Sequence, residues 1–300
     1  MARRRALAGR ATIIQTIRSF FLSQGYLEVE TPHRIPAPAP EVHIDTAPSG
    51  PWFLHPSPEL CMKRLLAAGY ERIFQVCRVW REGERGRRHT PEFTLLEWYR
   101  TNASYRDVME ECQALVEAVA ASLGMARQIC SQGKTISLAG PWDRVTVREA
   151  FLAYGGISME EALEDGSFDE VMVEAIEPAL GNDRPTFLLD YPAERGSLAR
   201  LRSDDPTVAE RFEFYIARVE LANAFTELTD PAEQRSRFEA EEARRRSLGK
   251  PHYPMPEKFL AELPFMPPSA GIALGVDRLA MILFNASSID DVVAFTPEEL

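Results

Sequence analysis

The segment RIFQVCRVWREGERGRRHTPEFTLLEWYR, residues 72–100, is the most informative stretch of this sequence. Both of its ends are rich in β-branched, aromatic and other apolar residues, which predicts strands at 72–80 and 92–100. The residues between them include glycines, a proline and several arginines, and this composition is typical of an irregular loop. The segment therefore predicts a strand, a basic loop and a second strand.

Helices are predicted on both sides of this unit. The spacing of Ile and Phe predicts a helix at 7–24, followed by a short strand at 26–30. Ser57, followed by Pro58, predicts the start of a helix that ends at Gly69. A strongly amphipathic helix is expected at 104–123, capped by Ser104 or Asp107. The proline-rich segment 34–51 is expected to be an irregular surface excursion.

The remaining two thirds of the chain also mix helices with strands. Residues 125–200 give a weak pattern, with short helices near 146–154 and 168–180 and a strand at 186–192. Residues 211–225 have the composition of a strand, and helices are expected at 231–247 and 256–263. A buried strand, GIALGV, runs directly into a helix, DRLAMILF. With no internal repeat and no long linker, one α+β domain over 1–300 is expected, with a helical insertion at about 125–200.

Composition narrows the class of protein. Hydrophobic residues make up 45% of the 300 residues and the formal net charge is −11, so an ordinary globular chain with an acidic surface is expected. Such a surface argues against non-specific binding to nucleic acid. The four cysteines form no CxxC pair, which favours reduced thiols over a zinc site. No membrane span and no secretory signal are recognisable, and a cytoplasmic location is expected.

Considered singly, the polar features have ordinary structural explanations. An arginine-rich loop is more often a solvated turn than an anion site, and Phe93 alone suggests core packing. Glu213, Glu220 and Glu227 recur at intervals of seven. On one strand an odd spacing alternates faces, so a bend or a bulge must intervene before all three can converge. Spacing alone does not settle their role.

Three segments taken in order carry a family resemblance. SFFLSQGYLEVETP, FQVCRVWREGERGRRHTPEF and GIALGVDRL resemble motifs 1, 2 and 3 of the class II aminoacyl-tRNA synthetases. SPELCMKRLL, RRHTPEFTLLEWY and ELANAFTEL are similar to the catalytic core of the lysyl-tRNA synthetases, and the likeness extends from about residue 7 to 296. This resemblance implies a class II catalytic fold, with a mainly antiparallel sheet flanked by helices. It also implies a homodimer built around the motif 1 helix and Pro32.

The length of the chain refines this resemblance. Because the motif 1 helix begins near residue 7, no anticodon-binding domain is expected. A free-standing lysyl-type core resembles the ligases that attach lysine or β-lysine to a lysine side chain of elongation factor P. Ala222 and Ala273, which stand where the synthetases usually have Gly, agree with this interpretation. Two alternatives stay open: a truncated lysyl-tRNA synthetase that charges tRNA, which the acidic charge argues against, and a non-catalytic module that senses lysine.

The resemblance also implies a site for ATP and Mg²⁺. The matching ATP-binding positions are Arg81, Glu82, Gly83, Thr90, Phe93, Glu220, Leu221, Gly275 and Arg278. Among them Arg81 and Arg278 are expected to be catalytic, Phe93 to stack on adenine, and Glu220 to bind metal together with Glu213. Gly83 and Thr90 depart from the family, which usually has Glu and Asn there. Glu82 and Glu84 flank Gly83 and offer substitute carboxylates.

The same resemblance implies a pocket for the amino acid. Its matching positions are Ser57, Glu59, Glu97, Tyr99, Asn223, Glu227 and Ala273. Glu227 is expected to meet the ε-ammonium group of the substrate and Glu59 its α-amino group, since a buried cation needs a partner of opposite charge. Glu97 and Tyr99 are two residues apart on a predicted strand, so both should face the pocket.

Overall fold

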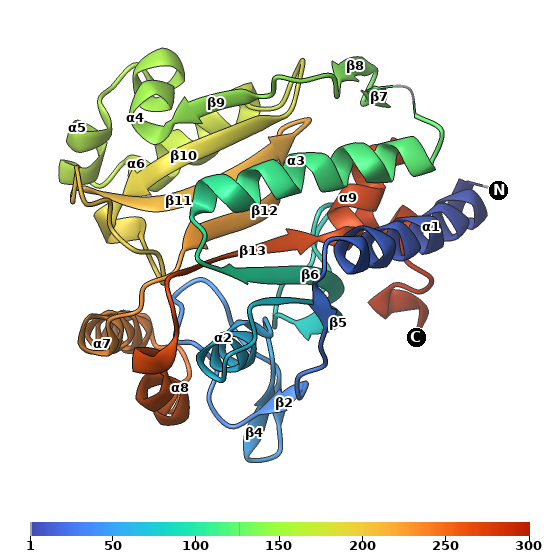
Figure 1. Ribbon diagram of the computed structural model, residues 1–300. Helices are drawn as coiled ribbons and strands as arrows, with labels where there is room; N and C mark the ends of the chain where they lie inside the picture. The colour runs from blue at the N-terminus through green and yellow to red at the C-terminus, as the bar shows by residue number, and fades with distance from the viewer. Residues whose placement is uncertain (1, 126) are drawn as a thin grey trace.

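The computed structural model describes residues 2–125 and 127–300, and its centre is an eight-stranded sheet in the order β1-β5-β6-β13-β12-β11-β10-β9 (Figure 1). The strands are β1 (Leu27–Glu28), β5 (Arg72–Trp80), β6 (Glu92–Thr101), β9 (Asp143–Thr146), β10 (Thr186–Pro192), β11 (Val208–Ile216), β12 (Val219–Thr226) and β13 (Ser269–Gly275). Neighbouring strands are antiparallel except for the β1–β5 and β9–β10 pairs. The expected α+β fold with a mainly antiparallel sheet is confirmed, as are the strands expected at 72–80 and 92–100.

Three helices cover one face of this sheet (Figure 1). They are α1 (Ala2–Ser23), α3 (Tyr105–Ser122) and α9 (Val276–Leu283). Ser104 and Asp107 form a capping box that starts α3, as the sequence indicates. Leu96 and Trp98 of β6 are buried against these helices. Since side chains alternate along a strand, Glu97 and Tyr99 project from the opposite face.

The opposite face carries the proline-rich segment and three more helices. The helices are α2 (Glu59–Ala67), α7 (Pro231–Ser247) and α8 (Glu257–Glu262), and a small sheet contains β2 (Arg34–Ile35), β3 (Pro48–Ser49) and β4 (Trp52–Leu54). The expectation that 34–51 is merely a surface excursion is wrong. Arg245 of α7, fully buried, donates hydrogen bonds to the carbonyl oxygens of Glu41 and Ile44 and to the Asp45 carboxylate.

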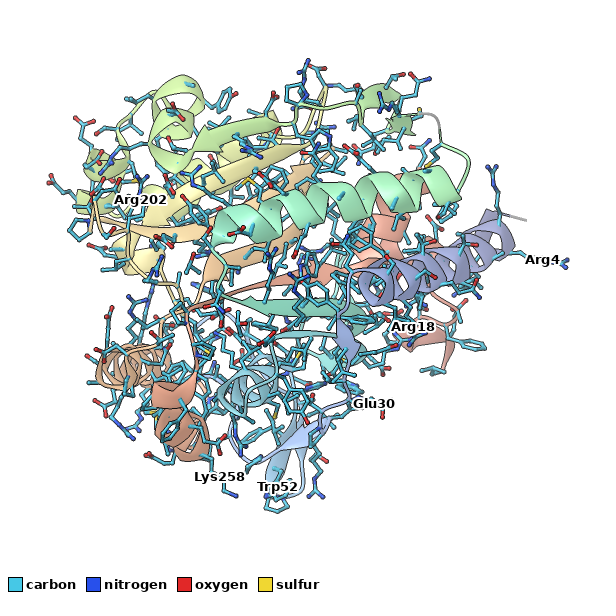
Figure 2. The ribbon with its side chains drawn as sticks, viewed as in Figure 1. Arg4, Arg18, Glu30, Trp52, Arg202 and Lys258 are labelled. Carbon is cyan, nitrogen blue, oxygen red and sulfur yellow. The ribbon has the colours of Figure 1, made fainter. Side chains whose placement is uncertain are left out.

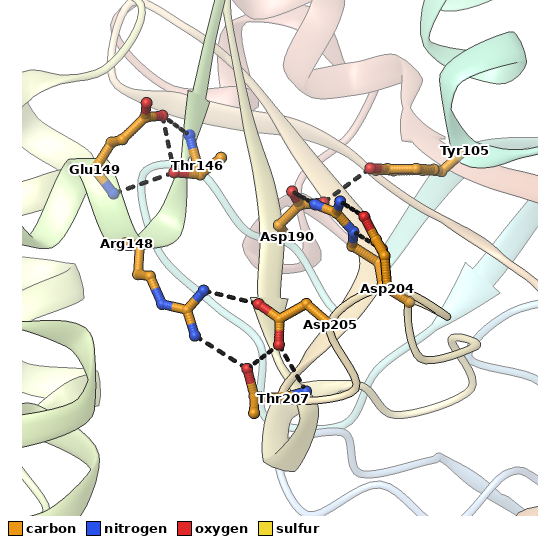
Figure 3. Close-up of polar contacts among 9 residues, drawn as sticks. Tyr105, Thr146, Arg148, Glu149, Asp190, Asp204, Asp205 and Thr207 are labelled. Carbon is orange, nitrogen blue, oxygen red and sulfur yellow. Dashed lines mark hydrogen bonds and ion pairs between the residues drawn. The ribbon is translucent and has the colours of Figure 1, made fainter.

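The segment expected as a helical insertion contains both helices and strands. Its helices are α4 (Val147–Ala150), α5 (Met159–Glu164), α6 (Phe168–Val171), and the π-helical turns Phe151–Gly155 and Met172–Ile176. A hairpin of β7 (Gln128–Ser131) and β8 (Lys134–Ser137) precedes them, whereas β9 and β10 belong to the main sheet. Arg148 of α4 reaches Asp205 and Thr207 before β11, which ties the insertion to the sheet (Figure 3). Single 3-10 turns lie at Glu177–Ala179, Ala193–Arg195, Leu263–Phe265, Ile289–Val292 and Pro297–Glu299.

Residues 211–225, expected as one strand, form most of a hairpin. Its turn consists of Ala217 and Arg218, whose φ angles are +53° and +64°. Positive φ at both central positions is typical of the tightest hairpin turns and is usually provided by Asn and Gly. Because Ala and Arg carry no such signal, the pattern could not reveal the turn.

Charged side chains cover the exterior. Arg4 and Lys258 point away from the body of the molecule, whereas Arg18 of α1 pairs with Glu28 (Figure 2). Within the residues that the structure describes, every helix is too short or too polar to cross a bilayer.

Candidate active site

The strand register assembles the site. Glu213 of β11 pairs with Asn223 of β12, Asn223 with Ala273 of β13, and Ala273 with Glu97 of β6. The adjacent row places Gly271 opposite Tyr99. Ala273 is small and stands between Asn223 and Glu97, so the middle of the sheet is hollow on this face, whereas the Tyr99 ring covers Gly271. A cavity of about 510 Å³ lies there.

Most of the residues predicted from the sequence line this cavity. They are Ser57, Glu59, Arg81, Thr90, Phe93, Glu97, Tyr99, Glu213, Glu220, Leu221, Asn223, Ala273, Gly275 and Arg278. Glu82, Gly83 and Glu227 are not among its lining residues. The fold thus brings together residues that are more than 200 positions apart in the sequence.

Glu82 and Gly83 lie outside the cavity because of the local turn. Gly83 has a φ of +76°, which an L-residue rarely adopts, and both residues are exposed. Beyond this turn Glu84 lines the cavity, with a carboxylate oxygen 3.7 Å from the Arg81 guanidinium. Glu84 therefore lies beside Arg81, whereas neither Glu82 nor Gly83 lines the cavity.

Glu213, Glu220 and Glu227 face the same side of the sheet for two reasons. The hairpin turn separates Glu213 from Glu220, so they lie on neighbouring strands. In β12 a register shift follows, because Tyr215 pairs with Glu220 whereas Phe214 pairs with Ala222. Leu221 is the extra residue of this bulge. It changes the alternation of side chains along β12, so that Glu227 projects from the same face of the sheet as Glu220. The bend or bulge that the spacing required is present.

One end of the cavity is rich in cations. The Arg81 guanidinium lies 5.1 Å from the centre of the Phe93 ring. Arg278, on the first turn of α9, donates to the carbonyl oxygen of Glu220 at 3.0 Å and lies 3.3 Å from its carboxylate. Its guanidinium also contacts His89, whose pKa is lowered by burial and by this neighbouring charge. An anionic ligand is favoured at this end.

The other end is rich in carboxylates. Glu97, which is 1% exposed, accepts hydrogen bonds from Ser57 Oγ at 2.5 Å and from Tyr99 Oη at 2.8 Å. Burial and the nearby Glu59 carboxylate raise the pKa of Glu97 to about 7, although both hydroxyl groups stabilise its charge. Glu97 and Tyr99 project from the same face of β6, as their spacing predicts, and both line the cavity.

Lys63 was not identified from the sequence. It lies on α2, is 1% exposed, and its Nζ is 2.6 Å from Glu59 and 2.5 Å from Glu227. Burial raises the pKa of Glu227 to about 8, and the Lys63 charge opposes that rise. A lysine four residues after Glu59 on an otherwise apolar helix face was the available signal.

A divalent cation fits the carboxylates of Glu213 and Glu220. Glu213 accepts hydrogen bonds from Arg211 and Tyr215, each at 2.6 Å, and its pKa is raised by burial and by the charge of Glu220. A bound cation would relieve that repulsion. Among the described residues no group of three or more His, Cys, Asp or Glu could hold a metal alone. Two carboxylates suit Mg²⁺, which takes its other oxygen ligands from phosphates and water.

Comparison with known proteins identifies the family. The family model for class II tRNA synthetases (D, K and N) matches residues 2–299. The chain therefore belongs to the class II tRNA synthetase family, with the α+β catalytic fold that the motifs predict. Membership of this family implies the use of ATP.

Curated relatives resemble nearly the whole chain. A protein of Edwardsiella ictaluri is 40% identical over 97% of this chain and 94% of its own length. One of Pectobacterium carotovorum is 41% identical over 97% of this chain and 95% of its own length, and one of Salmonella gallinarum is 40% identical over 97% and 94%. All three are called elongation factor P--(R)-beta-lysine ligase.

Substituting Gly271 by Ala tests how closely the site is assembled. The new Cβ would lie 2.2 Å from the Tyr99 ring and 2.6 Å from Glu227 Oε1. We expect Gly271→Ala to lower the free energy of unfolding by about 1–3 kcal/mol, because the ring must move. Urea unfolding followed by circular dichroism measures this change. Gly86→Ala is the control, because its Cβ would meet no atom within 4 Å. Equal stability of both variants would contradict this close approach.

Proposed function

We propose that this protein activates lysine or (R)-β-lysine with ATP and transfers the aminoacyl group to a lysine side chain of elongation factor P. In the first step the substrate carboxylate attacks the α-phosphorus of ATP, which forms an aminoacyl-adenylate and releases pyrophosphate. In the second step the acceptor amine attacks the acyl carbon, which forms an amide and releases AMP. The reaction consumes one ATP for each amide bond formed.

The separation of charge within one cavity carries this proposal. Arg81 and Arg278 lie at one end, where a triphosphate would be stabilised, and Phe93 beside Arg81 offers a face for adenine. Glu59 and Glu97 line the other end, where ammonium groups would be stabilised. An amino acid with a second amino group fits this arrangement because its carboxylate points to the arginines and its amines to the glutamates. The names of the relatives support the same substrate and acceptor.

The residues at the cationic end act on the reacting groups. Arg81 presents a guanidinium that can bind the substrate carboxylate and a phosphate oxygen together, and so aligns the two reactants. Arg278 is proposed to stabilise the charge that develops on the phosphates. Glu84 keeps the Arg81 side chain within the cavity. Thr90, Leu221 and Gly275 complete the wall.

Glu213 and Glu220 would hold Mg²⁺ beside these arginines. When bound, the ion supplies charge neutralisation for the phosphate groups. Arg211 keeps Glu213 in position and also donates to the side-chain amide oxygen of Asn223 at 3.0 Å. The same guanidinium therefore positions both Glu213 and Asn223. Arg211 was not identified from the sequence.

At the acidic end, Ser57 and Tyr99 position Glu97, and Glu59 forms the wall beside them. Ala273 lies opposite Glu97 and leaves space above the sheet. We propose that this space accommodates the shifted amino group of (R)-β-lysine. Because elongation factor P acts in translation, we also propose a cytoplasmic location.

The activity is tested by incubating the protein with ATP, Mg²⁺ and either lysine isomer. We expect amino-acid-dependent exchange between pyrophosphate and ATP, and an increase in the mass of added elongation factor P. Arg81→Lys should reduce exchange roughly 10²-fold or more, because the forked geometry is lost. Arg78→Lys, three residues earlier in β5 and outside the cavity, is the matched control.

Other outcomes identify the alternatives. Exchange followed by charging of tRNA, with no increase in the mass of elongation factor P, would indicate a truncated lysyl-tRNA synthetase. Lysine binding without exchange would indicate a sensing module.

The acidic end also predicts a dependence on pH. Since the pKa values of Glu97 and Glu227 are raised to about 7 and about 8, both carboxyl groups hold protons in slightly acidic solution. A neutral carboxyl group attracts an ammonium ion weakly. The KM for lysine should therefore fall by roughly tenfold as the pH rises from about 6 to 8. The loss of one proton can change this KM by at most about tenfold per unit of pH. Exchange kinetics measure this, and in Glu97→Gln the step near pH 7 should disappear. A KM that is constant across this range contradicts the assignment.

We also propose a homodimer formed around α1 and β1. Leu22 and Leu27 lie at the end of α1 and in β1, where they are 56% and 49% exposed. β1 is an edge strand, so its outer backbone groups are available for another chain. Light scattering should give twice the mass of the chain at micromolar concentration, and Leu27→Asp should shift the mass toward that of the monomer. A wild-type monomer at this concentration contradicts the proposal.

A further inference from the structure

We propose that Lys63 is a positioning residue that holds Glu59 and Glu227 at a fixed separation and favours the charged form of Glu227, and so adapts the pocket to an amino acid with two ammonium groups. This inference rests on the proposed function. It assigns to Lys63 no contact with the substrate. Lys63 acts through the two carboxylates that it joins.

The geometry of Lys63 is that of a bridge. Its Nζ lies 2.6 Å from Glu59 Oε1 and 2.5 Å from Glu227 Oε2. Both carboxylates contact one nitrogen atom, so neither can move without breaking an ion pair. The ammonium group is also 4.9 Å from the centre of the Phe225 ring, which is a further favourable contact for a cation. Two elements far apart in the sequence, α2 and the end of β12, are thereby tied together.

Each carboxylate has an oxygen that Lys63 does not contact. Glu227 Oε1 is buried and has no hydrogen-bond partner among the residues that the structure describes. It lies beside Gly271, 2.6 Å from the place that a Cβ would take, and the Tyr99 ring borders the same place. Gly271 and Tyr99 both line the cavity. The unpartnered oxygen thus lies just behind the cavity wall, where a substrate ammonium group that reaches the end of the pocket could meet it.

Charge explains why a buried cation is needed here. The groups that face one another are Glu59 and Lys63 of α2, Glu97 and Tyr99 of β6, and Glu227. Glu41 of the proline-rich segment lies near Glu59, and Arg81 opposes its charge. Three carboxylates in such a space repel one another, and burial already raises the pKa of Glu97 and Glu227. When Glu59, Glu97 and Glu227 are all ionised, Lys63 neutralises one charge and leaves two in excess. A substrate with two ammonium groups balances that excess, whereas one with a single amine leaves a buried carboxylate unpaired.

Lys63→Met tests the inference because methionine keeps the length of the side chain and removes its charge. We expect the KM for lysine or (R)-β-lysine in pyrophosphate exchange to rise tenfold or more at neutral pH, while the KM for ATP stays within about threefold. The lysine KM changes with pH, and we expect the midpoint of that change to move upward by one pH unit or more. The reason is that Glu227 loses its counter-charge. Discrimination between lysine and the shorter ornithine should decrease, since the separation of the carboxylates is no longer fixed.

Lys250→Met is the matched control. Lys250 pairs with Asp45 at 2.8 Å and does not line the cavity, so this variant should retain both KM values and the pH profile. A second variant, Lys63→Met/Glu227→Gln, removes both buried charges and should fold even if Lys63→Met does not. In this double variant the upward shift of the pH midpoint should be absent, because Glu227 has been replaced. The lysine KM should stay high, because the free carboxylate oxygen is gone.

Two results would overturn the inference. One is a Lys63→Met enzyme with the wild-type lysine KM and pH profile. The other is a double variant with the wild-type lysine KM, since that would mean that neither group matters for binding. Absence of exchange in the wild type with either lysine isomer would instead refute the proposed function, and the inference with it.

Discussion

The antiparallel register of β6, β13, β12 and β11 is the constraint on which this site depends. It places Glu97, Ala273, Asn223 and Glu213 in one row across four strands. Neighbouring strands lie about 4.8 Å apart, so the register fixes the distance between Glu97 and Glu213. A shift of one residue in β6 would turn Glu97 toward the helices and Trp98 into the cavity. The packing of Trp98 against α1 and α3 therefore also secures the position of Glu97 on the other face.

The distribution of arginines resolves an apparent conflict between a basic loop and an acidic chain. Arg85, at the tip of the loop, pairs with Asp290 and Glu298, and Arg78 lies 3.6 Å from Glu92. Arg81 and Arg278 instead face the cavity. The loop is thus no general surface for a polyanion, since part of its charge is neutralised within the chain. The cationic site that faces the cavity is small and lies beside Phe93.

The sequence predicted the parts of the structure that local patterns specify. The two strands of the opening segment have the expected bounds, and the cap of α3 has its expected partners. The hairpin at Ala217 was missed because its turn lacks the residues that usually permit a positive φ. Lys63 was missed for another reason: a single lysine in a helix suggests a solvated side chain, and only the tertiary contact with Glu227 shows that it is buried. Glu84 can take the place of the carboxylate missing at Gly83 only through the local turn there, which no pattern specifies.

Arg245 has a consequence for how this family of sites can diverge. Its guanidinium binds mainly to backbone carbonyl oxygens, those of Glu41, Ile44 and Pro251. Glu41 and Ile44 also line the cavity, so this wall is held by groups that every amino acid possesses. Side chains along the wall can therefore be exchanged while the path of the backbone is retained. The shape of this wall and its chemical preference can evolve separately.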